Sequence, residues 1–390
     1  MRPLTPAAIR FLASPPAQKE LAGLAGGELE PLATLARLRK VWGGERAAWL
    51  YDQALLRRRA RDKFPHAEAL LFEAEALEQA SHRLVASWRA REVFGPYARV
   101  ADLGAGIGGD ALALAAAGKR VLAVERDPLR AAILRHNAAA LGLAARIEVV
   151  AADWRGLRLR ADAAFADPAR RSGGRRTIHL DAMEPPFADV AALAARLPAV
   201  AVKLAPALVK GELPQEAGLG FVSLGGELKE ALAGLGELAW PQPWAAVLPA
   251  GERLFGPEPQ EERLAGPQAY LYEPDAAVIR AGLVRRLAAE LQAAQLDAQV
   301  AYLTAASCRR TPLARCWRVL RHGPYHFKTL RGWLQELGGT ATAVKRRHSP
   351  IEPAELAKKL PRAGARFLTV LLTRISGRNW MILAEDPSRL

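Results

Sequence analysis

The sequence predicts an α/β protein: a helical segment, then a Rossmann-like, doubly wound sheet, then an α+β domain. Three observations predict the sheet. Short apolar strands alternate with helices between residues 98 and 204. A glycine-rich turn follows the first strand, and acidic residues stand at successive strand ends, where such sheets bind ligands. We therefore expect three parts, residues 1–90, 91–265 and 266–390.

The composition excludes several classes of protein. The chain has 390 residues, 51% hydrophobic and 24% charged, which is typical of a globular protein. A run of about 18 uncharged apolar residues, as a membrane-spanning helix needs, is absent, and no apolar run follows the N-terminus as in a secretory signal. Two cysteines, Cys308 and Cys316, are too few for a disulfide framework or a zinc site. We therefore expect a cytoplasmic protein without a metal.

Residues 1–90 are expected to be helical. Apolar residues recur at helical spacing from Leu32 to Val41 and again after a pair of glycines. The basic run 57–63 then ends at Phe64. This run is interpreted either as a contact for phosphate or as a solvated helix face.

The central part is expected to contain five strands of a parallel sheet, with helices over residues 111–117 and 128–141. Residues 205–265 are rich in Gly and Pro and should supply the last strands and their loops. The five expected strands cover residues 98–103, 120–125, 147–150, 161–166 and 200–204.

The turn DLGAGIGGD, residues 102–110, is the main functional signal. Its glycines let the backbone approach a ligand closely and expose N–H groups at the start of a helix. Gly104, Gly106 and Gly109 also fit G-x-G-x-x-G, the dinucleotide fingerprint. The glycines alone therefore leave the ligand open.

Three acids at strand ends favour one ligand. Asp102 precedes the first glycine, where it would repel a pyrophosphate but could bind the α-amino group of a methionine moiety. Glu125 could accept ribose hydroxyls, and Asp153 could accept the adenine amino group. This series suits S-adenosylmethionine. A dinucleotide oxidoreductase and a plain glycine-rich turn are the alternatives.

The motifs resemble a known family. Residues 100–114 resemble motif I of class I S-adenosylmethionine-dependent methyltransferases, and Glu125-Arg126-Asp127-Pro128 is similar to their second motif. The whole chain resembles the bacterial class I methyltransferases with a C-terminal THUMP-like domain, in residues 167–176, 203–206, 225–230 and 272–274. The resemblance implies S-adenosylmethionine as cofactor and RNA guanine-N2 methyltransferases as relatives. The candidate cofactor-binding residues are Asp102, Gly104, Gly106, Gly108, Glu125, Arg126, Asp153 and Trp154.

Asp167 and Pro168 are the candidate catalytic residues. Asp167 could accept hydrogen bonds from the N–H groups of an exocyclic amine and so aim the nitrogen lone pair of the amine at the methyl group. Pro168 would stiffen the turn. Alternatively, Asp167 caps the turn. The related pattern often continues with proline and an aromatic residue, whereas this chain has Ala169 and Arg170. Covalent carbon methylation is disfavoured, because it needs a cysteine nucleophile and both cysteines lie in the last part.

Five basic residues are candidates for substrate binding. The four arginines could bind backbone phosphates or could be surface charge near the cofactor. The lysine lies near the end of the fifth strand, where it could contact substrate or pair with one of the acids. The five are Arg170, Arg171, Arg175, Arg176 and Lys203.

The charge distribution predicts a nucleic-acid partner. The net charge of +15 divides into +4 for residues 1–90, 0 for 91–265 and +11 for 266–390. Aromatic residues are interspersed in the basic part, which fits RNA binding, although Trp317 and Phe327 are expected in the core. The expected function is methylation of a base nitrogen in structured RNA, such as tRNA or rRNA. The alternatives are an RNA-binding module without turnover, or a methyltransferase acting on protein or a small molecule.

Overall fold

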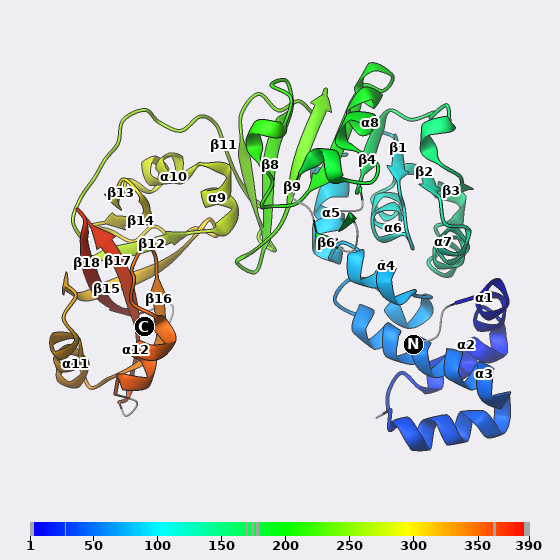
Figure 1. Ribbon diagram of the computed structural model, residues 1–390, viewed down its shortest axis with the longest axis horizontal. Coiled ribbons are helices and arrows are strands. Elements are labelled where there is room, and N and C mark those ends of the chain that lie inside the picture. Colours follow the sequence, from blue (N-terminus) through cyan, green and yellow to red (C-terminus); the bar gives the residue numbers. More distant parts are fainter. Residues whose placement is uncertain are drawn as a thin grey trace. The chain divides into compact units, whose positions relative to one another are not determined.

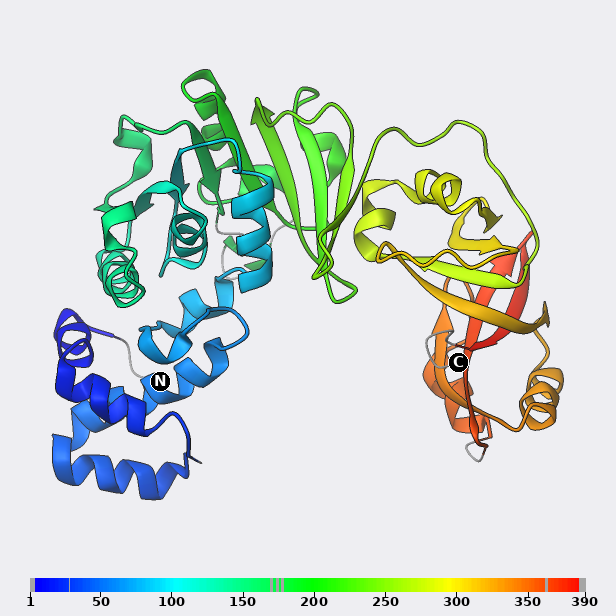
Figure 2. The same ribbon diagram turned by 180° about the vertical axis from the view of Figure 1, so that it is seen from behind.

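The computed structural model describes two compact units, Met1–Gly218 with Glu230–Trp240, and Leu219–Lys229 with Pro241–Leu390. Figures 1 and 2 show the chain from opposite sides. Among the described residues, no helix combines the length and the apolar character needed to cross a bilayer. The described residues are 4–27, 29–168, 171–172, 175–176, 179–361 and 364–385.

The first unit opens with helices, as predicted. Helix α3 is interrupted at Gly43, whose φ of 77° suits glycine best. The basic run at the end of α3 is structural: Arg57 donates to the carbonyl oxygen of Leu70 at 2.8 Å, and Arg61 to that of Ala25 at 3.2 Å. The helices are α1 (Pro6–Leu12), α2 (Pro15–Gly23), α3 (Pro31–Ala60), α4 (Ala74–Gln79) and α5 (Arg83–Glu92).

The five predicted strands are present and run parallel in the order β7-β4-β1-β2-β3. Strands β4 and β7 are buried along their whole length, as expected for a sheet covered on both faces. Helices α6 (Gly109–Ala116) and α7 (Pro128–Ala140) follow the first two strands. The strands are β1 (Arg99–Leu103), β2 (Arg120–Glu125), β3 (Ile147–Ala151), β4 (Ala163–Ala166) and β7 (Ala199–Leu204).

The sheet continues beyond β7 in the order β9-β8-β10-β11 and is not entirely parallel. β9 (Glu227–Gly236) pairs antiparallel with β7. Only Gly225 and Gly226, with φ of 62° and 83°, separate β9 from β8 (Gly218–Leu224). Such a two-residue turn reverses the chain, which explains the antiparallel direction. The last two strands are β10 (Trp244–Leu248) and β11 (Glu252–Phe255).

The second unit also holds a seven-stranded sheet, in the order β13-β14-β12-β15-β18-β17-β16. The sequence of residues 276–294 predicts one helix. The structure instead has two helices and the start of a strand there, because Gly282 and Gln292 adopt left-handed conformations that end α9 and α10. The elements are β12 (Tyr270–Pro274), α9 (Ala276–Ala281), α10 (Val284–Leu291), β13 (Ala294–Asp297), β14 (Val300–Ala305), β15 (Ala314–Pro324), α11 (Phe327–Glu336), β16 (Gly339–Arg346), α12 (Pro353–Lys359), β17 (Arg366–Ile375) and β18 (Arg378–Glu385).

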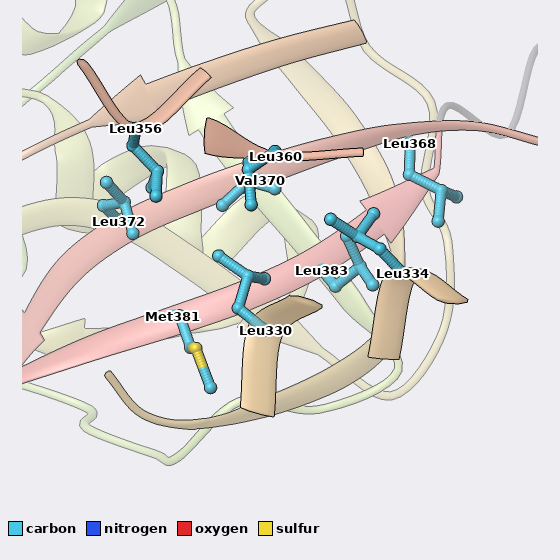
Figure 3. Close-up of a cluster of buried hydrophobic side chains, with 9 residues drawn as sticks. All are labelled: Leu330, Leu334, Leu356, Leu360, Leu368, Val370, Leu372, Met381 and Leu383. Atoms are coloured by element: carbon cyan, nitrogen blue, oxygen red, sulfur yellow. The ribbon is translucent and has the colours of Figure 1, made fainter. Parts of the chain in front are cut away.

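Leucines from α11, α12, β17 and β18 form one hydrophobic core of this sheet (Figure 3). Trp317 is fully buried in a second cluster, as predicted. Tyr325, Phe327 and Trp333 are partly buried and pack against the first cluster. These aromatic side chains therefore contribute first to packing.

Candidate active site

The turn after β1 presents its backbone to open space. Gly104 and Gly106 have φ of 80° and 56°, and a Cβ at either position would meet no neighbouring atom within 4 Å. Gly108 serves packing instead, because a Cβ there would collide with Leu134 of α7. The turn thus provides the close backbone approach that a ligand requires.

Asp102 lies at the carboxyl end of β1 and is 2% exposed. Within the described part of the chain, its Oδ2 atom has no hydrogen-bond partner. Desolvation, and then the negative charge of Asp110, raise the pKa of Asp102 well above its usual value. A buried carboxylate oxygen without a hydrogen-bond partner is costly, so this position is suited to receive a cationic ligand group.

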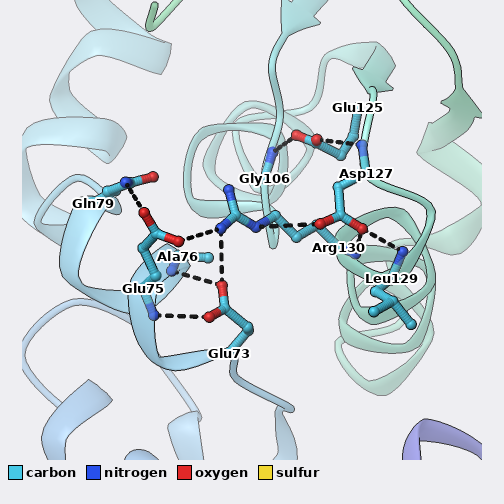
Figure 4. Close-up of polar contacts among 9 residues, drawn as sticks. All are labelled: Glu73, Glu75, Ala76, Gln79, Gly106, Glu125, Asp127, Leu129 and Arg130. Atoms are coloured by element: carbon cyan, nitrogen blue, oxygen red, sulfur yellow. Dashed lines mark hydrogen bonds and ion pairs between the residues drawn. The ribbon is translucent and has the colours of Figure 1, made fainter. Parts of the chain in front are cut away.

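Glu125 fixes the second strand end to the glycine turn. Its Oε2 accepts from the backbone N–H of Gly106 at 2.7 Å, and its Oε1 accepts from that of Asp127 at 2.8 Å (Figure 4). Each carboxylate oxygen has a second lone pair. Glu125 is therefore oriented and can still accept ligand hydroxyls.

Arg130 links this region to the N-terminal helices. Its Nη2 lies 3.1 Å from a carboxylate oxygen of Glu73 and 3.1 Å from one of Glu75 (Figure 4). Asp127 accepts from the backbone N–H groups of Leu129 and Arg130 at the start of α7. These contacts hold α7 in place beside Glu125.

The remaining cofactor candidates are Arg126, Asp153 and Trp154. Asp153 follows β3, and its pKa falls to about 2 chiefly because Arg155 donates to its carboxylate, at 2.6 Å from Nη2 to Oδ2. It is therefore ionised at neutral pH and can accept from an amino group. Trp154 beside it is 8% exposed, and the exposed Arg126 lies 3.5 Å from Glu184.

Asp167 follows β4 and forms an ion pair with Lys203 of β7. The Nζ atom of Lys203 lies 2.5 Å from Oδ2 of Asp167. Of the two interpretations of Lys203, the structure shows the ion pair with an acid. Pro168 is buried. The pair stands at the same edge of the sheet as Asp102 and Glu125, because these parallel strands all end there.

Behind this edge lies a buried charged cluster that the sequence did not indicate. Arg89 of α5 is 1% exposed and binds Asp110 of α6 and Glu230 of β9. Burial alone would lower the pKa of Arg89, but the two acids raise it above its usual value. Its guanidinium carbon also lies 4.3 Å from the ring centroid of Phe165. Glu230 belongs to the motif 225–230, whereas nothing distinguishes Arg89 among the many arginines.

Four of the candidate residues for substrate binding are arginines that follow Asp167 in the sequence. Arg170 lies outside the described residues. The backbones of Arg171 in β5 (Arg171–Ser172) and of Arg175 and Arg176 in β6 (Arg175–Arg176) form an antiparallel pair. Their side chains are outside the described part, so their role in substrate binding stays a prediction.

The Rossmann-like sheet, the glycine turn and the acids at its edge define a class I methyltransferase. The chain is 35% identical over 350 residues to an uncharacterized S-adenosylmethionine-dependent methyltransferase of Mycobacterium tuberculosis, covering 85% of this chain and 94% of that protein. This chain therefore belongs to the S-adenosylmethionine-dependent methyltransferases, and its cofactor is S-adenosylmethionine. The unpartnered oxygen of Asp102 and the open turn at Gly104 and Gly106 fit that cofactor.

Two family models match parts of the chain. The RNA cap guanine-N2 methyltransferase family matches residues 97–181, and the THUMP domain-like family matches residues 314–386. The fold is similar along its whole length to the crystal structure of a candidate methyltransferase from Porphyromonas gingivalis. The TM-score is 0.76 at 21% identity, covering 98% of both chains.

Proposed function

We propose that the enzyme methylates an exocyclic amine on a base of structured RNA, with tRNA and rRNA as candidate substrates. The observation that carries the proposal is Asp167, a carboxylate held by Lys203 at the cofactor edge of the sheet. The match of residues 97–181 to guanine-N2 methyltransferases makes the guanine N2 amine the first candidate.

The proposed chemistry depends on positioning. Bound S-adenosylmethionine supplies an electrophilic methyl group on sulfur. Transfer would form a carbon–nitrogen bond as the carbon–sulfur bond breaks, would release S-adenosylhomocysteine as the neutral thioether, and would release the proton of the amine to solvent. Asp167 accepts a hydrogen bond from an N–H group of the amine. This contact orients the lone pair of the amine nitrogen toward the methyl group. Pro168 restricts the backbone of this turn.

Residues of the glycine turn and the strand ends would hold the cofactor. Asp102 would bind the α-amino group, Glu125 the ribose hydroxyls and Asp153 the adenine amino group. Gly104, Gly106 and Gly108 shape the turn, which Glu125 holds through the N–H of Gly106. Arg126 and Trp154 flank Glu125 and Asp153 in the sequence and complete the proposed set.

The second unit would bind RNA, although part of its positive charge is neutralised internally. Arg318 pairs with Glu385, and Lys345 and Arg347 pair with Glu273. Exposed cations remain on α11, where Lys328 and Arg331 are three residues apart and so share one face. The division into a helical segment, a methyltransferase domain and a basic domain is part of this proposal.

RNA affinity of the full chain should fall steeply with salt. Each phosphate contact contributes a slope of about −0.7 to −0.9 in log K against log salt. Replacing both Lys328 and Arg331 by alanine should reduce the slope by up to about two such contacts. Lys358→Ala is the control, because Glu355 already shares that charge at 2.7 Å. Fluorescence anisotropy at several salt concentrations measures the slope, and equal slopes for all three proteins would contradict RNA binding by this helix face.

Asp167→Ala should lower kcat about 100-fold, because the amine loses its acceptor and its orientation. The dissociation constant of S-adenosylmethionine should stay within about twofold, because Asp167 is assigned to the amine. Asp162→Ala is the matched control. Asp162 lies just before β4, and its ion-pair partner is the exposed Arg99. Equal activity of both variants would show that Asp167 is a structural residue of the turn.

Nucleoside mass spectrometry of total RNA, from cells with and without the gene, tests the substrate. The expected result is one missing methylated nucleoside with a methylated exocyclic amine. An unchanged nucleoside profile would favour a protein or small-molecule substrate. RNA binding without any transfer would favour a binding module.

A further inference from the structure

We propose that Lys203 and Ser81 are positioning residues that set the direction of the Asp167 carboxylate, so that the helical N-terminal segment completes the catalytic site. The inference rests on the proposed function, because it gives Asp167 the role of holding the substrate amine. It adds a task for a segment of which the sequence predicted only that it is helical.

The first step is the contact of Lys203 with the turn. Lys203 is 6% exposed, and its Nζ atom lies 2.5 Å from Oδ2 of Asp167. A buried ammonium group is stable only with close partners. Since Lys203 binds Oδ2, the other carboxylate oxygen of Asp167 can accept from the amine.

The second step is the contact of Lys203 with Ser81, which lies between α4 and α5 and is 7% exposed. Its Oγ atom accepts from Nζ of Lys203 at 3.2 Å and from Nη2 of Arg89 at 3.1 Å. Its hydroxyl donates to Oδ2 of Asp110 at 3.2 Å. One serine therefore joins the Asp167 pair to the Arg89 cluster.

The third step is the balance of charge. Asp102, Asp110 and Glu230 are carboxylates of the same site, and Asp102 and Asp110 interact strongly enough to shift the pKa of Asp102. Arg89 binds Asp110 and Glu230 directly, and Ser81 joins Lys203 to this cluster. Without Lys203, Asp167 would lose its cation, and repulsion from the other acids would favour turning its carboxylate toward water.

Lys203→Met tests this role in the full chain, with Lys119→Met as control. Lys119 precedes β2 at the opposite edge of the sheet and donates to the carbonyl oxygen of Gly95. Lys203→Met should lower kcat on total RNA from cells lacking the gene by about 100-fold. The dissociation constant of S-adenosylmethionine, measured by calorimetry, should stay within about twofold, and Lys203→Arg should recover part of kcat.

Ser81→Ala is a smaller change that preserves the fold if Lys203→Met does not. It should lower kcat about 10-fold, since Lys203 keeps Asp167 but loses its anchor. Hydrogen exchange followed by mass spectrometry provides a readout independent of the substrate. The peptide over residues 163–168 should exchange faster in Lys203→Met and Ser81→Ala than in the wild type and the Lys119→Met control.

The two proposals fail in different ways. If the wild-type enzyme transfers no methyl group to RNA, the proposed function fails, while hydrogen exchange still decides the positioning role. If RNA is methylated but kcat and hydrogen exchange are unchanged in Lys203→Met and Ser81→Ala, the positioning role is overturned. A loss of S-adenosylmethionine affinity equal to the loss of kcat also overturns it, because the cluster would then serve the cofactor.

Discussion

Asp102→Asn is expected to weaken S-adenosylmethionine binding by about 2–5 kcal/mol, roughly 30-fold to several-thousand-fold. The carboxylate is buried, and its Oδ2 atom has no hydrogen-bond partner in the described part of the chain, so it can give its full charge to the α-amino group. Asparagine keeps the shape and removes the charge. Calorimetric titration measures the change, with Asp162→Asn near the start of β4 as control, and an unchanged affinity would remove Asp102 from the cofactor site.

The same substitution should stabilise the protein without cofactor. Burial raises the pKa of Asp102 in the folded state, so the wild type loses stability as pH rises above the unfolded value of 3.8. Asparagine has no such loss. The melting temperature of Asp102→Asn should exceed that of the wild type at pH 7, with the difference shrinking toward pH 4. If the difference in melting temperature between Asp102→Asn and the wild type did not depend on pH, a raised pKa of Asp102 in the folded protein would be contradicted.

Arg89→Met is expected to destabilise the first unit by about 3–5 kcal/mol, because Asp110 and Glu230 would stay buried without their cation. The melting temperature should fall by roughly 10 °C for a unit of this size. Thermal unfolding followed by circular dichroism measures the effect.

Arg99→Met is the matched control for that change. Arg99 also binds a carboxylate, Asp162 at 2.7 Å, but its side chain is 58% exposed. Removing such a surface pair should cost less than about 1 kcal/mol. Adding Glu230→Gln to Arg89→Met should recover part of the lost stability, since it removes one uncompensated charge. Equal losses for the Arg89 and Arg99 variants would contradict a buried cluster.

Sequence patterns predicted the parts of this protein that depend on neighbouring residues. Strands β1 to β4 and β7 follow from short apolar runs, and the turn at Gly104 and Gly106 follows from its glycines. The direction of β9 was missed, although the pair Gly225-Gly226 is a hairpin signal. Likewise, Gly282 marks the end of α9 within the helix predicted over residues 276–294.

The contacts that complete the site could not be predicted in this way. Arg89 and Glu230 are 141 positions apart, and Lys203 and Ser81 are 122 apart. Pattern and propensity describe single elements, whereas these pairs depend on how the elements pack. The net charge counted over residues 266–390 has the same limit, because a count of charges does not show that Glu273 and Glu385 form ion pairs with several of the cations.

The distance along the chain between Arg89 and Glu230 has a consequence for synthesis on the ribosome. The first unit consists of two segments of the chain, Met1–Gly218 and Glu230–Trp240, and residues of the second unit lie between them in the sequence. While a nascent chain lacks that strand, α5 and α6 can meet, but the guanidinium of Arg89 has only one of its two acids. The ribosome must therefore synthesise β9 before the first unit can finish folding. Chains that terminate earlier should be degraded by proteases.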